Sequence, residues 1–444
     1  MSTSTDPSDL TRPAVTRPAV TRPDLTGTPP RSVPFDRDLL TPSVVHLGTH
    51  GLRRAHHAVY FDELARRRIS DDWGLVRVEL QPPGARTLHL DHLQEHRVLV
   101  TGSAATSTRE VEVLVDHVTR TDDSGSVLDA LAAPTTRLVV LQVAGGETSP
   151  PPGTAPSLPA VAHGYLVRAL ARRRDTGLPP FTVLNCDPSP GNGHRTREAV
   201  LTLARAEDPG LAAWIEERAA FPCSVLDPLL SGTGGCPGWV VQDEFCDGRP
   251  PLEQVGARFV ASTAPHGVLR TRLLDGARYA VSAVARRTGA ARTDEALADP
   301  RVSAFLGGFL QEVATLLLDV PGIDLDAYRS AVLARLADPR TGEPLAPAGR
   351  HGGGGFAAAV LPSLRLARDQ HRPRRHLVLA VAAWLSSLPG AGSDAGSLLD
   401  GHRDLLGTLA DDTHLAAELQ EALELLASGA FDPSRRDTTR GARP

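Results

Sequence analysis

Hydrophobic and polar positions follow two different patterns in the two halves of the chain. Up to residue 143, short apolar runs that are typical of buried strands alternate with segments whose apolar residues recur every three or four positions. Strands are predicted over residues 43–47, 73–80, 98–100, 111–115 and 137–143, and helices over residues 54–64 and 127–132. Elements that alternate in this way indicate a parallel sheet covered by helices.

The second half carries only the helical spacing. Helices are predicted over residues 305–318, 325–336, 356–368, 377–388 and 413–426, and the glycine tract at 352–355 predicts a flexible loop. The ends of the chain, rich in proline and polar residues, predict a disordered leader (1–38) and a disordered tail (433–444). The fold class is therefore α/β followed by α, with a sheet domain at 39–262 and a helical domain at 263–432.

A glycine-containing turn follows the first predicted strand. Gly48 and Gly51 lie between that strand and the helix that begins at Arg54, and such a turn can present backbone N–H groups to a phosphate. His50 stands where the G-x-G-x-x-G fingerprint has its second glycine, so an ordinary strand–helix turn is an open alternative. Glu79, at the end of the second strand, is a candidate partner for ribose hydroxyls or simply an exposed acid.

Composition narrows the classes of partner. A net charge of −5 argues against nucleic acid or an anionic membrane surface as the main partner. The four cysteines lack C-x-x-C spacing, and no carboxylate or cysteine cluster completes the histidines of the HLDHLQEH segment, so no metal site is expected. No apolar run is long enough for a membrane span, and we expect a cytoplasmic protein.

The wording of several segments is more specific than their pattern. The run HLG…RRAHHAVYFDEL after the first strand, the run GLPPFTVLNCD…NG, and the run WVVQDEFCDGRPP each closely resemble segments of the mannitol dehydrogenase family, which are long-chain polyol and sugar-acid dehydrogenases. The resemblance extends from about Val44 to beyond Pro362. It implies an expanded Rossmann-type domain, a mostly helical C-terminal domain, and NAD or NADP as cofactor.

The resemblance also implies positions for the cofactor and the substrate. Gly48, Gly51, Arg54 and Glu79 fall at the expected dinucleotide site, and Asn192 falls at the crevice between cofactor and substrate. The turn composition around Asn192 leaves a purely structural role open. The expected substrate is a small sugar alcohol or an anionic sugar derivative, and the sequence gives no indication of protein partners.

The family's catalytic helix usually carries K-x-x-x-x-N-x-x-H, in which the lysine is the base. Here the three positions are Arg270, Asp275 and Arg278, so all three are replaced. An arginine stays charged and cannot accept a proton. Asp275 could serve as the base, but the flanking arginines would lower its pKa, and the i, i+3 spacing predicts an ion pair with Arg278.

Two functional hypotheses follow. In the first, Asp275 or His266 takes the proton, while Arg270 and Arg278 bind a phosphate or carboxylate of the substrate. The enzyme would then interconvert mannitol, mannitol 1-phosphate or a sugar-acid derivative and the ketose. In the second, the chain has lost catalysis and serves as a nucleotide- or ligand-binding protein.

Overall fold

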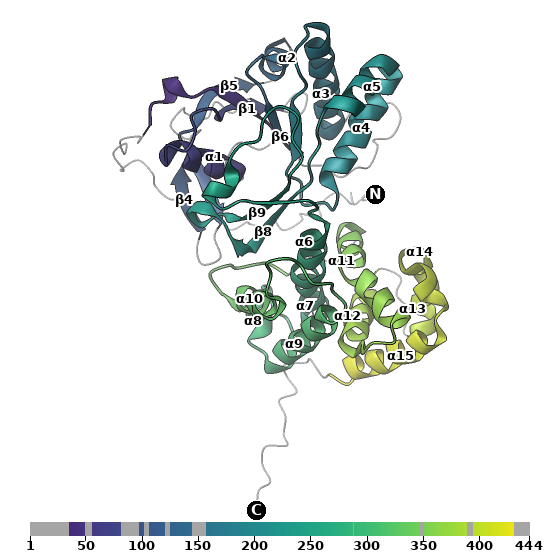
Figure 1. Cartoon of the computed structure of the whole chain (residues 1–444). Helices are drawn as coiled ribbons and strands as arrows, with labels where there is room; N and C mark the ends of the chain where they lie inside the picture. The colour runs from purple at the N-terminus through teal and green to yellow at the C-terminus, as the bar shows by residue number, and fades with distance from the viewer. Residues whose placement is uncertain are drawn as a thin grey trace, which may run out of the picture. The chain divides into compact units, whose positions relative to one another are not determined.

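The first half of the chain forms a five-stranded parallel sheet (Figure 1). A computed structural model describes residues 35–48, 56–80, 97–101, 106–119, 125–143, 157–286, 288–345, 350–388 and 394–429. The strand order is β5-β2-β1-β6-β7. The strands are β1 (Pro42–Gly48), β2 (Gly74–Glu79), β5 (Leu114–Thr119), β6 (Leu138–Gln142) and β7 (Thr182–Asn185). The chain therefore builds outward from β1 first on one side and then on the other, which is the Rossmann arrangement.

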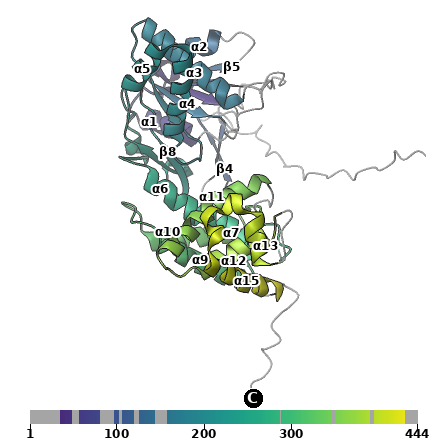
Figure 2. The same ribbon diagram turned by 90° about the vertical axis from the view of Figure 1, so that its right-hand side faces the viewer.

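Successive residues of the strands enter two different hydrophobic cores. Val44 of β1 packs with α1, whereas Val45 packs with the helices on the opposite face. Figures 1 and 2 both show α2, α3, α4 and α5 side by side on that opposite face. The helices of the sheet domain are α1 (His56–Arg66), α2 (Gly125–Ala132), α3 (Leu158–Asp175), α4 (Asn192–Glu207) and α5 (Pro209–Arg218). Burial on both faces explains why the strands read as continuous apolar runs.

Two smaller sheets complete this half. The first has the order β10-β9-β8, with β8 antiparallel to β9 and β9 parallel to β10. Its strands are β8 (Ser224–Ser231), β9 (Pro237–Gln242) and β10 (Arg258–Val260). The second pairs β3 (Arg97–Thr101) with β4 (Thr106–Glu110). The predicted strand at 111–115 is confirmed only at its end, because residues 111–113 lie between β4 and β5, and β5 begins at Leu114.

The second half of the chain is helical and has one large core. Its helices are α6 (Ala264–Leu269), α7 (Gly276–Ala285), α8 (Thr293–Leu297), α9 (Pro300–Ala314), α10 (Leu325–Ala337), α11 (Arg350–Asp369), α12 (Arg375–Leu385), α13 (Ala395–Gly401), α14 (Arg403–Leu406) and α15 (Thr413–Ala427). A π-helical segment, η6 (Arg270–Asp275), joins α6 to α7. Both views show α7, α9, α12 and α15 close together (Figures 1 and 2).

The glycine tract is part of a helix, so the predicted loop is wrong. Residues 350–355 form the first turns of α11. A side chain on Gly355 would have no room, since its Cβ would lie 2.6 Å from Cζ of Tyr279. Close packing between α11 and α7 therefore overrides the low helix propensity of glycine.

The predicted disordered ends lie mainly outside the described residues, which begin at Phe35 and end at Gly429. The predicted domain boundary near residue 262 stays a prediction. No helix in the described part of the chain is long and apolar enough to cross a membrane.

Candidate functional site

The carboxyl edge of the sheet brings together the predicted cofactor residues of β1 and β2. Gly48 ends β1, and its register neighbours are Glu79 at the end of β2 and Gln142 at the end of β6. The strand order reverses between β1 and β6, and in such sheets the ligand crevice lies beyond the strand ends at this point. Any side chain at Gly48 would collide, because its Cβ would lie 2.6 Å from Nε2 of His46 and 3.0 Å from the Gln142 carbonyl.

A hydrogen bond from Arg77 fixes the carboxylate of Glu79. Arg77, a buried side chain of the same strand, donates to Oε2 of Glu79 at 2.6 Å. The Glu79 side chain retains 19% exposure, so it can also accept hydrogen bonds from a ligand at the strand end. An acid at this position suits the ribose hydroxyls of a dinucleotide. The other two predicted cofactor residues, Gly51 and Arg54, lie outside the described residues.

Asn192 lies at the start of α4, where its side chain links three segments. Its Nδ2 group donates to the carbonyls of Asp187 (2.7 Å) and Ser224 (3.0 Å). Its Oδ1 atom accepts from the backbone amides of Gly193 (2.9 Å) and Ser224 (3.0 Å). Both donors of the buried amide are therefore used within the protein, which favours the structural role that the sequence left open.

The three replaced catalytic positions lie on η6 and on the following turn of α7. Arg270 begins the π-helical segment and Asp275 ends it. Hydrogen bonds from residue i to i+5 bring residues five apart onto one face, and such segments are frequent at functional sites. Arg270 Nη2 and Asp275 Oδ1 are 3.6 Å apart, while their side chains keep 18% and 22% exposure.

The predicted ion pair between Asp275 and Arg278 is wrong. The guanidinium carbon of Arg278 lies 5.8 Å from the ring centre of Tyr279, and the carboxylate of Asp275 pairs with Arg270 instead. The wider turn of a π-helix changes which residues face each other, and the periodicity of the sequence gives no sign of such a turn.

A buried carboxylate on β8 also faces this segment. Asp227 is only 1% exposed, and its Oδ2 atom accepts from the hydroxyl of Tyr328 on α10 at 2.7 Å. Its Oδ1 atom accepts from the backbone amide of Leu229 at 2.9 Å. His266, on α6, is 4% exposed and its Nδ1 atom has no partner. No signal in the sequence would bring Tyr328 to Asp227, because the two residues are 101 positions apart.

Burial dominates the acid–base properties of the group. It raises the pKa of Asp275, although the guanidinium groups of Arg270 and Arg278 oppose the shift. The arginines do lower the pKa of Asp275, as expected from the sequence, but loss of hydration outweighs them. Burial also raises the pKa of Asp227, against the hydrogen bonds from Leu229 and Tyr328. The pKa of His266 is lowered, first by burial and then by Arg258.

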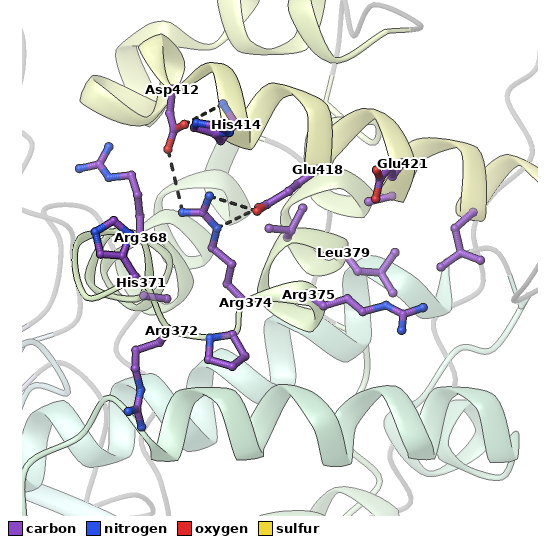
Figure 3. A pocket seen from close by; sticks show the side chains of 15 residues that line it. Arg368, His371, Arg372, Arg374, Arg375, Leu379, Asp412, His414, Glu418 and Glu421 are labelled. Atoms are coloured by element: carbon purple, nitrogen blue, oxygen red, sulfur yellow. Dashed lines mark hydrogen bonds and ion pairs between the residues drawn. The ribbon is translucent and has the colours of Figure 1, made fainter.

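Two other kinds of site in the described part of the chain, a metal cluster and a pocket between helices, do not involve these residues. Among the residues that the structure describes, no group of three or more His, Cys, Asp or Glu side chains could hold a metal ion. A pocket of about 910 Å³ lies between α12 and α15 and is lined by no candidate site residue. Figure 3 shows Arg374 of this pocket between Glu418 and Asp412; its Nε donates to Glu418 at 2.8 Å. We therefore assign the candidate site to the strand ends and η6.

Comparisons with known proteins cover both halves of the chain. Residues 42–254 match the model of the mannitol dehydrogenase Rossmann domain, and residues 264–425 match that of the mannitol dehydrogenase C-terminal domain. Similar solved structures are those of D-sorbitol dehydrogenase in substrate-free form (24% identity, TM-score 0.74, 89% of this chain and 95% of that one) and of Pseudomonas fluorescens mannitol 2-dehydrogenase in a ternary complex with NAD and D-mannitol (22%, 0.71, 89% and 94%). At these identities the likeness concerns the fold.

Curated relatives agree with the family models. D-mannonate oxidoreductase of Escherichia coli (strain K12) is 30% identical over 82% of this chain and 84% of its own length. Mannitol 2-dehydrogenase of Cereibacter sphaeroides is 28% identical, over 88% of this chain and 94% of its own length. The resemblance in the sequence is thus confirmed along nearly the whole described chain, and the chain belongs to the mannitol dehydrogenase family.

Proposed function

We propose that this protein is an NAD(P)-dependent oxidoreductase that interconverts a polyol or sugar-acid derivative and the corresponding ketose. The observation that carries the proposal is the family match of both domains, including relatives named mannitol 2-dehydrogenase and D-mannonate oxidoreductase. The parallel sheet with its strand-order reversal at β1 supports the same conclusion, because this is where a dinucleotide binds in such folds.

The residues at the strand ends fit a dinucleotide. Gly48 ends β1 without a side chain of its own, and Glu79 offers a fixed carboxylate beside it. We assign Gly51 and Arg54 to the same site from the family motif, and Asn192 to holding the start of α4 in position through its four backbone hydrogen bonds. The bound nicotinamide would accept the hydride that leaves the substrate carbon.

Removal of the hydroxyl proton needs a group other than Arg270. We assign this role to Asp275. Its carboxylate is partly exposed and forms an ion pair with Arg270, with 3.6 Å between Oδ1 and Nη2. Burial raises the pKa of Asp275, which makes the carboxylate a stronger base than an ordinary aspartate. His266 is the other candidate for the base, but only 4% of it is exposed and it interacts with Asp227.

The two arginines determine which substrates suit the site. Arg270 and Arg278 replace groups that carry at most one fixed charge in the family pattern, and guanidinium groups bind carboxylates and phosphates well. We therefore expect mannitol 1-phosphate or a sugar acid to be preferred over mannitol itself.

The first experiment is a titration with NADH and with NADPH, followed by nicotinamide fluorescence. Saturable binding of at least one is expected, and no signal with either would refute the dehydrogenase proposal. Turnover is then measured with mannitol, mannitol 1-phosphate, fructose, fructose 6-phosphate and hexuronates. Binding without turnover on any of them would favour the catalytically silent alternative.

A variant pair tests the assignment of the base. Asp275→Asn should lower kcat by on the order of 10²–10⁴ while NADH binding is kept. Asp319→Asn, at an exposed carboxylate outside the site, is the matched control and should leave kcat unchanged. Equal activity of the two variants would contradict the role of Asp275.

A further inference from the structure

Asp227 and Tyr328 form a buried pair whose partners come from different halves of the chain. The hydroxyl of Tyr328, on α10, donates to Oδ2 of Asp227, on β8, at 2.7 Å. Both residues are buried: Tyr328 is 4% exposed and Asp227 is 1% exposed. With Leu229 bound to the other oxygen at 2.9 Å, the carboxylate is fixed in position. Neither oxygen is directed at solvent, so Asp227 is poorly placed to exchange protons with a substrate.

Arg270 interacts with two carboxylates. Asp275 is its ion-pair partner at 3.6 Å, and Asp227 interacts electrostatically with the same guanidinium. The Nε atom of Arg270 is buried and has no hydrogen-bond partner. An arginine that remains charged at every relevant pH would, on its own, hold Asp275 ionised and make it a weak base.

We propose that Asp227 and Tyr328 are positioning residues for proton removal: the fixed negative charge of Asp227, held by Tyr328, offsets Arg270 and leaves Asp275 able to accept the substrate proton. The inference rests on the proposed function, and it assigns a task to two residues that do not touch the reacting atoms. Tyr328 thereby connects the helical half of the chain to the charge balance of the site.

The charges that face Asp275 have opposing effects. Arg270 and Arg278 lower the pKa of Asp275, whereas Asp227, on β8, and Glu343 raise it together with burial. His266 lowers the pKa of Asp227, and Arg258 in turn lowers the pKa of His266. Removing the charge of Asp227 should therefore let both arginines prevail, so that Asp275 holds its proton less tightly.

Tyr328 acts one step further away. Its hydroxyl stabilises the ionised form of Asp227, whose pKa burial already raises. Tyr328→Phe should therefore raise the pKa of Asp227 and weaken its charge at the acid end of the pH range. The effect on Asp275 has the same sign as in Asp227→Asn but is smaller.

The test measures the titration of Asp275 directly. Carbon-13 NMR of aspartate-labelled protein follows the Asp275 carboxyl carbon, which is assigned by its loss in Asp275→Asn. In Asp227→Asn the titration midpoint should fall by about one pH unit, as expected for removal of a nearby charge in a partly buried site. In Tyr328→Phe it should fall by less.

Tyr60→Phe is the control for loss of a buried hydroxyl. The Tyr60 hydroxyl donates to the Pro237 carbonyl at 2.8 Å, and neither residue belongs to the site. This variant should lose stability but keep the Asp275 midpoint. A midpoint that stays in place, or rises, in Asp227→Asn would overturn the inference.

Kinetics provide a second readout and separate the two proposals. The acid limb of the kcat/KM profile should move to lower pH in Asp227→Asn, by the same amount as the NMR midpoint. If NADH and NADPH fail to bind while the Asp275 midpoint still falls, the proposed function is wrong but the charge balance is right. If cofactor binds and substrate turns over without either shift, the charge balance is wrong and the proposed function stands.

Discussion

Replacing Gly193 by alanine, at the start of α4, should favour the helix locally but create a steric clash with the backbone of Pro222. Alanine is favoured over glycine inside a helix by about 1 kcal/mol. A Cβ at position 193, however, would lie 2.6 Å from both the carbonyl carbon and the oxygen of Pro222, which are backbone atoms. Overpacking of this kind costs about 1–3 kcal/mol, and the segment that must move is also tied to Asn192. We expect a net destabilisation of up to about 2 kcal/mol.

Gly164→Ala is the matched control in the same half of the chain. Gly164 lies within α3, and nothing lies within 4 Å of the position of its Cβ. Here the helix preference acts alone, so this variant should gain up to about 1 kcal/mol. Urea unfolding, followed by circular dichroism, should move its midpoint up and that of Gly193→Ala down. If Gly193→Ala were stabilised as much as Gly164→Ala, the close approach of α4 to Pro222 would be refuted.

Three further outcomes follow from described contacts. Glu79→Ala should weaken NADH binding about tenfold to a hundredfold, the value of a hydrogen bond to a charged group, as measured by fluorescence titration, and should affect NADPH less. Burial and Arg77 lower the pKa of His46 to about 3, so below pH 6.5 the unfolded chain binds a proton that the folded chain does not. The free energy of unfolding should therefore be highest above pH 6.5 and should fall by up to about 1.4 kcal/mol per pH unit below it. His46→Gln should show a shallower slope. On α9, Gly308→Ala should lower the melting temperature and Gly307→Ala should not. Only the first places a Cβ against the imidazole ring of His376, 2.6 Å from its Cδ2 atom.

The strands of the main sheet could be predicted from sequence because burial on both faces leaves a local signal. The apolar run at 43–47 became β1, and 137–143 became β6, with ends shifted by one residue. Five helices of the second half, α9, α10, α11, α12 and α15, were also predicted from their three- and four-residue spacing. The strand predicted at 111–115 begins three residues too early, because Val111 and Val113 are buried in the loop between β4 and β5 and burial alone does not distinguish a strand from a loop.

The charge arrangement of the site could not be predicted in the same way. The sequence singled out Arg270, Asp275 and Arg278, but which arginine pairs with Asp275 depends on a π-helical turn that leaves no periodic signal. The partner of Asp227 is on a helix about a hundred positions away, and only the folded chain brings the two together. The net direction of the Asp275 pKa depends on burial, which a single sequence does not give.

The wide turn at η6 has a consequence for the length of the polypeptide. Each residue of an α-helix rotates the chain by about 100°, and a π-helical turn contains roughly one residue more than an α-helical one. Deleting Thr271 would therefore restore an ordinary helix and rotate Arg270 and His266 away from Asp275, even though every charged side chain of the segment would still be encoded. Transplanting this helix between relatives requires that its residue count be preserved as strictly as its polar residues.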